Sequence, residues 1–398
     1  MKNQAHPLKA SDDPAKPTRP SRLLIVVNDA EFFLSHRAVL ARAARARGWQ
    51  VHVAYADGGR GCLSDTPDWT AHRVPMSRSG LSPVGNLRSL VALAVLCRRL
   101  RPDLVHAVAL KGVVLGGMAA RIAGIEARLL AIAGLGQVVT ARQGRGAQLG
   151  RMSQRLLPWI AGRRGRVIVQ NDNDLAWVRG TGIPDSRITL IPGSGVDLTA
   201  FPHRPEPDGP LRAILPARMI WKKGVGEFVA AARLLKERGT PLRMALVGAP
   251  DPGNPSSVPE QTLREWDREG IVEWMGQRSD MPAVIGSSHI VALPSFYGEG
   301  VPKVLLEAAA IGRPVVTTDT PGCRHAVQHG ETGILVPPED AEALADALAD
   351  LANDPAVRRR YGEAGRARAE RLFDVSGVVT QHLDLYQSLL EEARARAN

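Results

Sequence analysis

Short apolar runs alternate with longer stretches of helical periodicity along almost the whole chain, and this alternation limits the fold more than any other feature. The first apolar run, residues 23–27, is followed by a helix-like stretch that ends at Gly48, and the next run begins at Val51. Strands joined through helices pair in parallel, because each connection crosses back over the sheet. The sequence therefore predicts an α/β fold built on parallel sheets.

A proline-rich segment divides this alternation into two halves. Residues 201–210 contain four prolines and few apolar residues, which is typical of a linker. We expect a disordered extension over 1–20, Rossmann-like domains over 21–200 and 211–375, and a C-terminal helix over 376–398. Ligands of such sheets bind beyond the carboxyl ends of the strands, so two facing sheets predict a site in the cleft between the domains.

The charge is divided unevenly between the two halves. Residues 1–200 hold 28 Lys and Arg against 13 Asp and Glu, and residues 201–398 hold 23 against 27, so that +15 and −4 give the net charge of +11. A basic half indicates contact with a membrane surface, a phosphorylated substrate or nucleic acid, or else an ordinary solvated surface. No run reaches the roughly 18 apolar residues of a membrane span, and three widely spaced cysteines are typical of a reducing compartment. We predict a cytoplasmic protein.

The strongest chemical signal is the segment PSFYGEGVPKVLLE at residues 294–307. A strand ends there in a glycine-containing loop, and Pro302 is expected at the first position of a helix. The free N–H groups of that first turn, together with the helix dipole, form an anion site. Glu299 precedes the helix, and Glu307 lies one turn after Lys303 on the same face. Carboxylates beside an anion site fit a sugar nucleotide, whose hydroxyl groups donate to them.

A second signal lies between a strand and a helix at residues 218–224, RMIWKKG. Arg218 and Lys223 can reach one phosphate group from two directions, and we expect them to stabilise the negative charge on a departing diphosphate. Taken alone, this pair has an equally good interpretation as solvated surface residues.

Together these residues resemble glycosyltransferase family 4, the retaining transferases of the GT-B fold, in which two Rossmann-like domains face each other across a cleft. The resemblance runs from about residue 22 to the end and depends on Arg218 with Lys223, on the E-x7-E pair Glu299 and Glu307, and on the segment GVD at 195–197. It implies that Arg218 and Lys223 hold the donor diphosphate and that Glu307 binds the ribose. Glu299, with the backbone of the two residues that follow it, would contact the donor sugar.

The resemblance implies further details of the reaction. The sugar keeps its anomeric configuration, and the leaving phosphate accepts the proton of the acceptor, so that no protein nucleophile, metal ion or other cofactor is needed. The segment Asp172-Asn173-Asp174 resembles a metal motif, but it stands before a helix, where Asp and Asn serve as caps. The other residues that the resemblance assigns to the donor are His106 near the reacting carbon, Gly276, Gln277 and Arg278 near the base, and Gly300, Val301, Pro302 and Lys303 in the donor loop.

The first half is similar to a narrower group of bacterial transferases that extend polyprenyl-diphosphate-linked sugars in surface polysaccharide and glycoprotein assembly. The matching stretches are residues 28–37, 102–106, 134–136, 170–171 and 191–197. This similarity implies UDP-linked N-acetylhexosamine as the donor and a lipid-linked saccharide as the acceptor. His36 and Lys111 would contact the acceptor diphosphate. Gly112 stands where the group often has proline, which leaves the acceptor's identity open.

Several alternatives remain open at this point. Residues 151–166 carry five arginines, with Met152, Leu156 and Trp159 at helical spacing. This pattern fits a peripheral helix on the anionic inner face of the cell membrane or a helix packed on the core. The sequence contains no nucleic-acid-binding module, and aromatic residues make up only 4%. A nucleotide-sugar 2-epimerase of the same fold and a non-catalytic nucleotide-sugar-binding protein are the alternative functions.

Overall fold

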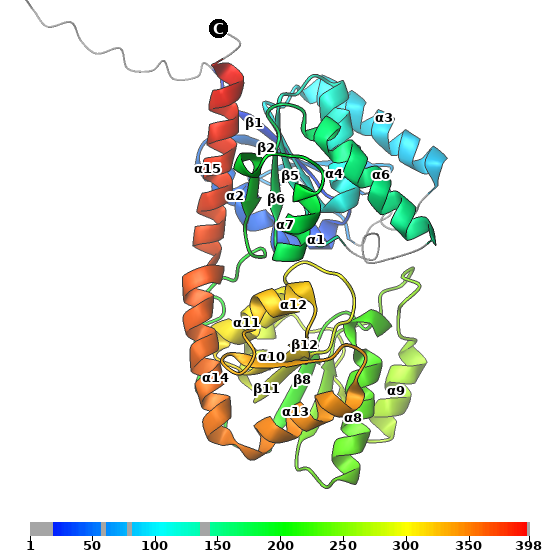
Figure 1. Cartoon of the computed structure of the whole chain (residues 1–398), viewed down its shortest axis with the longest axis vertical. Coiled ribbons are helices and arrows are strands. Elements are labelled where there is room, and N and C mark those ends of the chain that lie inside the picture. Colours follow the sequence, from blue (N-terminus) through cyan, green and yellow to red (C-terminus); the bar gives the residue numbers. More distant parts are fainter. Residues whose placement is uncertain (1–18, 57–60, 78–81, 136–143, 396–398) are drawn as a thin grey trace, which may run out of the picture.

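The computed structural model describes residues 19–56, 61–77, 82–135 and 144–395, and it shows two α/β units stacked along the long axis of the molecule (Figure 1). Each unit is built on one sheet whose strands all run parallel, so the predicted fold class is confirmed. The predicted disordered extension lies outside the described residues except for its last two positions, and Gly136 lies outside them too.

The first sheet has the strand order β3-β2-β1-β4-β5-β6-β7. Its strands are β1 (Arg22–Val26), β2 (Gln50–Ala56), β3 (Thr70–Val74), β4 (Leu104–Val108), β5 (Ala127–Ala131), β6 (Arg166–Val169) and β7 (Ile188–Leu190). Both β4 and β5 are buried along their whole length, as expected for central strands of a parallel sheet that is covered on both faces.

Helices cover both faces of this sheet because alternate side chains of each strand point to opposite sides. Leu23 and Ile25 pack in one core with α1 (Ala30–His36), α2 (Ala38–Ala46) and α15 (Val375–Arg394). Leu24 and Val26 pack in another core with α3 (Pro83–Leu100) and α4 (Ala109–Ile122). Along the sheet, α6 (Gly144–Ala161) and α7 (Asp172–Arg179) extend the second layer.

The second sheet has the order β10-β9-β8-β11-β12-β13. Its strands are β8 (Arg212–Pro216), β9 (Arg243–Val247), β10 (Glu273–Trp274), β11 (Ile290–Leu293), β12 (Val315–Thr318) and β13 (Gly333–Val336). The helices around it are α8 (Val225–Glu237), α9 (Glu260–Arg268), α10 (Met281–Gly286), α11 (Lys303–Ile311), α12 (Pro321–Ala326) and α13 (Ala341–Asn353). Among the described residues, no helix has the length and apolar character needed to cross a membrane.

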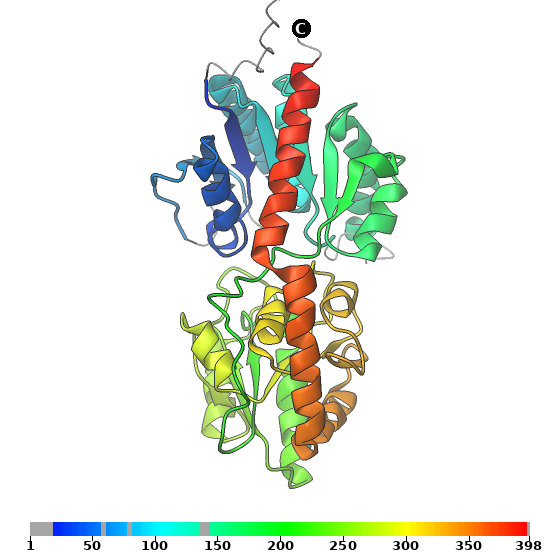
Figure 2. The same ribbon diagram turned by 90° about the vertical axis from the view of Figure 1, so that its left-hand side faces the viewer.

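The end of the chain ties the two units together. Helix α14 (Pro355–Arg368) lies on the second unit, continues through a π-helical turn (Ala369–Phe373), and leads into α15, which lies against the first sheet (Figure 2). At the crossing, the N–H of Val196 donates to the carbonyl of Phe373 over 2.8 Å, and the N–H of Val375 donates to the carbonyl of Val196 over 3.0 Å. The two chain segments that pass between the units, one around Val196 and one around Phe373, are therefore hydrogen-bonded to each other.

Candidate active site

A cavity of about 880 Å³ lies between the two units, and both contribute to its wall. The loop after β1 and helix α1 supply one side. The loops after β8 and β11, with the start of α11, supply the other side, as the rule for strand carboxyl ends predicts. The predicted site residues that line this cavity are His36, Arg218, Lys223, Gln277, Glu299, Gly300, Val301, Pro302 and Lys303.

The donor loop leads from the end of β11 to the start of α11, as predicted. Pro302 caps the helix with φ −66° and ψ 121°, and the first helical residue is Lys303. Pro302 thus stands one position earlier than expected, because its backbone is extended rather than helical. The N-terminus of α11 still opens on the cavity, which keeps the geometry from which an anion site is expected there.

Lys223 ends a short 3₁₀ turn (Trp221–Lys223), and its ammonium group forms an ion pair with the carboxylate of Glu299. The other carboxylate oxygen of Glu299 accepts a hydrogen bond of 2.7 Å from the Ser295 hydroxyl. Gly224 follows with φ +77°, and a Cβ atom there would lie 2.1 Å from the carbonyl oxygen of Pro294. Glycine is therefore required for the close approach that brings Lys223 to the donor loop.

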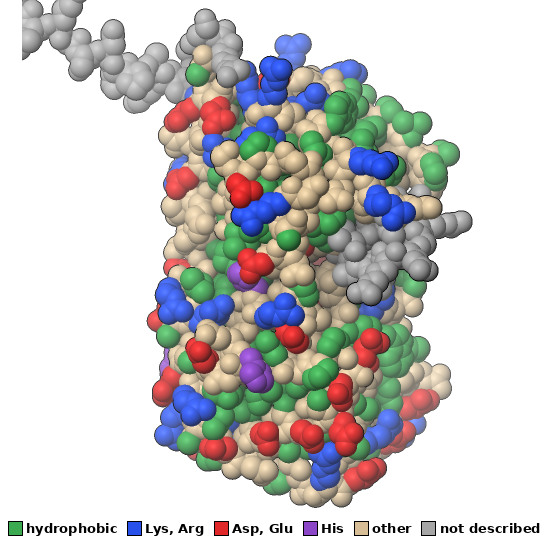
Figure 3. All heavy atoms as spheres, viewed as in Figure 1, with side chains coloured by type: hydrophobic (Ala, Val, Ile, Leu, Met, Phe, Trp, Pro, Cys, Tyr) green, Lys and Arg blue, Asp and Glu red, His purple; other side chains and the backbone are tan. Residues whose placement is uncertain are grey.

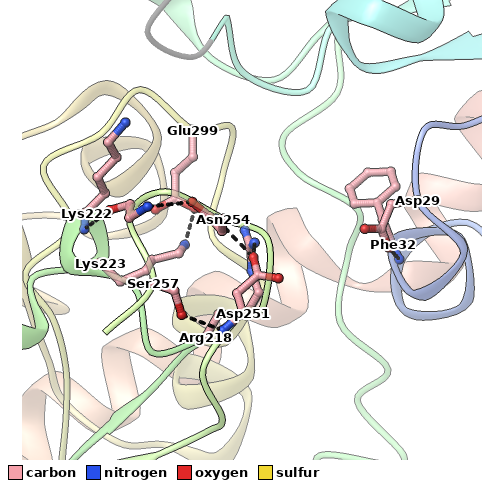
Figure 4. Close-up of polar contacts among 10 residues, drawn as sticks. Asp29, Phe32, Arg218, Lys222, Lys223, Asp251, Asn254, Ser257 and Glu299 are labelled. Atoms are coloured by element: carbon pink, nitrogen blue, oxygen red, sulfur yellow. Dashed lines mark hydrogen bonds and ion pairs between the residues drawn. The ribbon is translucent and has the colours of Figure 1, made fainter. Parts of the chain in front are cut away.

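Arg218 is held by a carboxylate that the sequence analysis missed. Its Nη1 atom lies 2.5 Å from Oδ2 of Asp251, which is fully buried. Oδ2 also accepts from the Asn254 side chain, and the Asp251 N–H donates to the Ser257 hydroxyl (Figure 4). The segment APDPGNPSS after β9 could have indicated this turn, since Asp and Asn fix such loops through side-chain hydrogen bonds. Asp251 thus orients the guanidinium toward the cavity.

A smaller cavity of about 390 Å³ adjoins the first one, and both are lined by Arg218 and Gln277. Glu307 and Arg278 lie in its wall, and burial raises the pKa of the Glu307 carboxyl, with the Lys303 ammonium 3.6 Å away. Gly276 does not line either cavity; its carbonyl accepts from the Gly248 N–H. The two cavities therefore meet at Arg218 and Gln277.

Helix α1 forms the opposite wall of the main cavity (Figure 4). The His36 ring stacks on Phe32 with ring centroids 4.5 Å apart, and its Nδ1 lies 2.7 Å from the Ser35 hydroxyl. Burial and the nearby cations, first Arg37 and then Lys303, lower the pKa of His36 to about 3. The Lys303 ammonium donates to the Ser35 carbonyl over 2.9 Å, so α11 is hydrogen-bonded directly to α1, the helix that carries His36.

The two units touch at glycines. Gly134, with φ +87°, lies so close to the donor loop that a Cβ atom would be 2.2 Å from the nitrogen of Gly300. A Cβ atom on Gly300 would lie 2.1 Å from Oε1 of Gln170, and one on Gly322 would lie 2.0 Å from the Gly300 carbonyl oxygen. The donor loop is therefore enclosed by backbone from both units.

Two predicted residues lie elsewhere. His106 was expected to face the cleft, and this is wrong: it is fully buried, and its Nδ1 lies 2.6 Å from the hydroxyl of Tyr386 on α15. Its side chain points to the face of β4 that the C-terminal helix covers. Lys111 does not line either cavity, and its ammonium donates to the Ser77 carbonyl over 2.6 Å. Neither His106, predicted near the reacting carbon of the donor, nor Lys111, predicted at the acceptor diphosphate, lines the two cavities.

We expect Tyr386→Phe to reduce stability and to leave catalysis nearly unchanged. The change removes the hydrogen bond to buried His106, and losing a buried partner costs about 1–3 kcal/mol. Urea unfolding should show this loss in the free energy of unfolding. Tyr55→Phe is a matched control in the same unit, since that buried hydroxyl makes only a 3.4 Å contact with Leu63 and its removal should cost less. Equal losses in both variants, or a large fall in turnover with Tyr386→Phe, would contradict this structural role.

The segment Asp172-Asn173-Asp174 forms the first turn of α7, and Asn171 is the cap, with its side chain accepting from the Asp174 N–H over 2.9 Å. Burial raises the pKa of Asp174 to about 6, and its carboxylate accepts from the backbone of Gly134 and Leu135. These residues therefore support the helix start and the loop that contacts the donor site. Within the described ranges, no group of three or more His, Cys, Asp or Glu is arranged to hold a metal ion.

Comparison with known proteins agrees with this geometry. Residues 22–163 match the family described as glycosyl transferase 4-like, and residues 211–354 match the family described as glycosyl transferases group 1. A relative from Campylobacter jejuni, N,N'-diacetylbacillosaminyl-diphospho-undecaprenol alpha-1,3-N-acetylgalactosaminyltransferase, is 28% identical over 79% of this chain and 85% of its own length. The capsular polysaccharide biosynthesis glycosyltransferase CapM of Staphylococcus aureus is 23% identical over 88% and 93%.

Solved structures share the fold. Sucrose-phosphate synthase from Thermosynechococcus elongatus superposes with a TM-score of 0.77 at 21% identity, over 94% of this chain and all of that one. Anabaena HepE, solved with UDP and glucose, superposes with a TM-score of 0.72 at 18% identity, over 92% and 100%. The chain belongs to the glycosyltransferases of the GT-B fold.

Proposed function

We propose that the protein transfers N-acetylhexosamine from a UDP-linked donor to a polyprenyl-diphosphate-linked saccharide in cell-surface polysaccharide biosynthesis, with retention of configuration, in the cytoplasm at the inner face of the membrane. The observation that carries the proposal is the convergence of the α11 N-terminus, Lys223 and Arg218 on one cavity between the units. A diphosphate is the ligand that best matches three positive groups on one side of a space.

The neighbouring groups match the rest of a nucleotide sugar. Glu307 lies deep in the adjoining cavity, where its carboxyl can accept from ribose hydroxyls, and Gln277 and Arg278 border the space for a base. Glu299 lines the main cavity beside Lys223, where its carboxylate can accept from the hydroxyls of a sugar attached to the diphosphate. The name of the Campylobacter relative and the UDP bound to HepE support this choice of donor.

The chemistry follows from where charge develops. When the bond between the sugar and the diphosphate breaks, the negative charge grows on the leaving phosphate, which faces Arg218, Lys223 and the helix N-terminus. Glu299 is ion-paired with Lys223 and bonded to Ser295, an arrangement that suits binding better than nucleophilic attack. The leaving phosphate then accepts the proton of the acceptor on the same face, which retains the configuration.

The acceptor side suits a diphosphate attached to a lipid. Phe32 and the exposed Leu34 supply apolar surface on the cavity wall, and His36 and Lys303 stand beside them. The neutral imidazole of His36 can donate to a phosphate oxygen through the ring nitrogen that does not contact Ser35. The name of the Campylobacter relative supports this acceptor class, and the name of the Staphylococcus relative supports the role in surface polysaccharide biosynthesis.

A donor screen tests the proposal. UDP-sugars and other nucleotide sugars are incubated with the protein and a polyprenyl-diphosphate-linked sugar, and the product is read by mass. We expect a mass gain of one N-acetylhexosamine from the UDP donor, an α-linked product by NMR, and an unchanged rate after EDTA. Loss of the rate in EDTA with recovery on adding a divalent cation would contradict the metal-independent site. Epimerisation of UDP-N-acetylglucosamine without acceptor would favour the isomerase instead.

A further inference from the structure

Helix α3 turns an apolar row to the outside of the molecule. Val84, Leu87, Val91 and Val95 are 78%, 61%, 55% and 57% exposed, at the spacing of one helix face. The row is about 16 Å long at 1.5 Å per residue. Leu93 and Cys97 on the inner face already pack on the sheet, so the outer row plays no part in the core. Four such side chains in line on a surface point to a partner.

Arginines flank the apolar row on the same face of α3. Arg88, Arg98 and Arg99 are exposed, and the helix contains no Asp or Glu. Between Asp68 and Asp172 the sequence holds 16 Lys and Arg against two acids, Asp103 and Glu126. A fitting partner therefore needs negative charges at its surface, to contact the arginines, and an apolar layer beneath them, to take up the apolar row.

The neighbouring helix α6 extends this surface. Met152 and Trp159 are exposed there beside the exposed Arg151 and Arg155, and the Arg121 guanidinium lies over the Trp159 ring at 4.9 Å. Helix α4 packs between α3 and α6, so both outer helices belong to one layer. Figure 3 shows hydrophobic and basic side chains gathered over this side of the first unit.

We propose that the outer faces of α3 and α6 form a docking surface for an anionic lipid bilayer. The apolar row enters the headgroup boundary, and the arginines contact the lipid phosphates. A second copy of the chain fits less well, because a symmetric pairing would set arginine against arginine on helices that contain no acid. This inference rests on the proposed function. A molecule docked through this surface would hold its cavity near an acceptor whose lipid chain lies in the membrane.

Vesicle cosedimentation of the full chain tests the docking surface. We expect binding to vesicles of phosphatidylglycerol and phosphatidylcholine at low salt and little binding to phosphatidylcholine alone. The double change Leu87→Ser with Val91→Ser should weaken binding about tenfold or more, because partitioning scales with buried apolar area. The triple change Arg88→Gln, Arg98→Gln and Arg99→Gln should reduce binding to the anionic vesicles by a similar factor.

The matched control is Arg371→Gln with Leu372→Ser, an exposed basic and apolar pair on the π-helical turn at the opposite side of the molecule (Figure 1). It should bind as the unchanged protein does. No binding at low salt, or equal binding by all variants, would overturn the proposal. So would a dimer in light scattering that only the α3 changes dissociate. The assay uses neither donor nor acceptor, so a protein that binds vesicles through α3 without transferring sugar contradicts only the proposed function.

Discussion

Replacing Lys223 by alanine is expected to lower the rate of sugar transfer by about 10²- to 10³-fold at saturating donor, the usual effect of removing one group that stabilises transition-state charge. The Lys223 ammonium lines the cavity and is ion-paired with Glu299 while no diphosphate is bound. A diphosphate in the cavity offers it a stronger partner. The loss should appear in kcat, because the negative charge on the diphosphate grows only as the bond to the sugar breaks.

Lys222→Ala is the matched control for this prediction. Its side chain belongs to the same turn but points away from the cluster around Glu299 (Figure 4), and it does not line the cavity. We expect Lys222→Ala to turn over as the unchanged protein does and both variants to unfold at similar temperatures. A rate for Lys223→Ala within about threefold of that of Lys222→Ala would remove Lys223 from the charge-stabilising role.

Local sequence patterns were sufficient for most of the fold and for the loop and helix start around Pro302. The strand–loop–helix pattern around residues 294–307 predicted both the helix start at Pro302 and the two carboxylates, because every part of that site lies close in the chain. Arg218 and Lys223 also follow a strand, but on their own they fitted solvated surface residues equally well, and their role was implied by the family resemblance. Three details of the donor side differ. Pro302 stands one position earlier than expected, since helix ends depend on the dihedral angles of a single residue. Gly276 lines neither cavity, and Asp251, which holds Arg218, was not predicted.

The failures have physical reasons too. His106 lies in a strand that is buried on both faces, so the sequence alone does not say which face its side chain takes. The face was decided by α15, which lies 280 residues further along and supplies Tyr386. Strand β3 (Thr70–Val74) was missed because it is an edge strand with exposed polar residues. The helix-like stretch that ends at Gly48 proved to be two helices, α1 and α2, and the first of them begins at Ala30, where Asp29 caps it.

The contact between the two units leads to the second large expected effect. Gly134→Ala should reduce the transfer rate by about 10²-fold while both units stay folded. A Cβ atom at Gly134 would lie 2.2 Å from the nitrogen of Gly300 and 2.5 Å from the carbonyl carbon of Glu299. Ordinary contact begins at 3.4 Å, so the donor loop must move away by about 1 Å, and misplacement on this scale costs about 10²-fold in rate.

Strain from the left-handed backbone must be separated from this steric effect, and Gly124→Ala provides the control. Gly124 has φ +78°, close to the φ of +87° at Gly134, but a Cβ atom there would meet nothing within 4 Å. Both variants should lose about 1–2 kcal/mol of stability from the alanine conformation, whereas only Gly134→Ala should lose turnover. Equal turnover in the two variants would mean that transfer does not require the glycine-lined contact between the units.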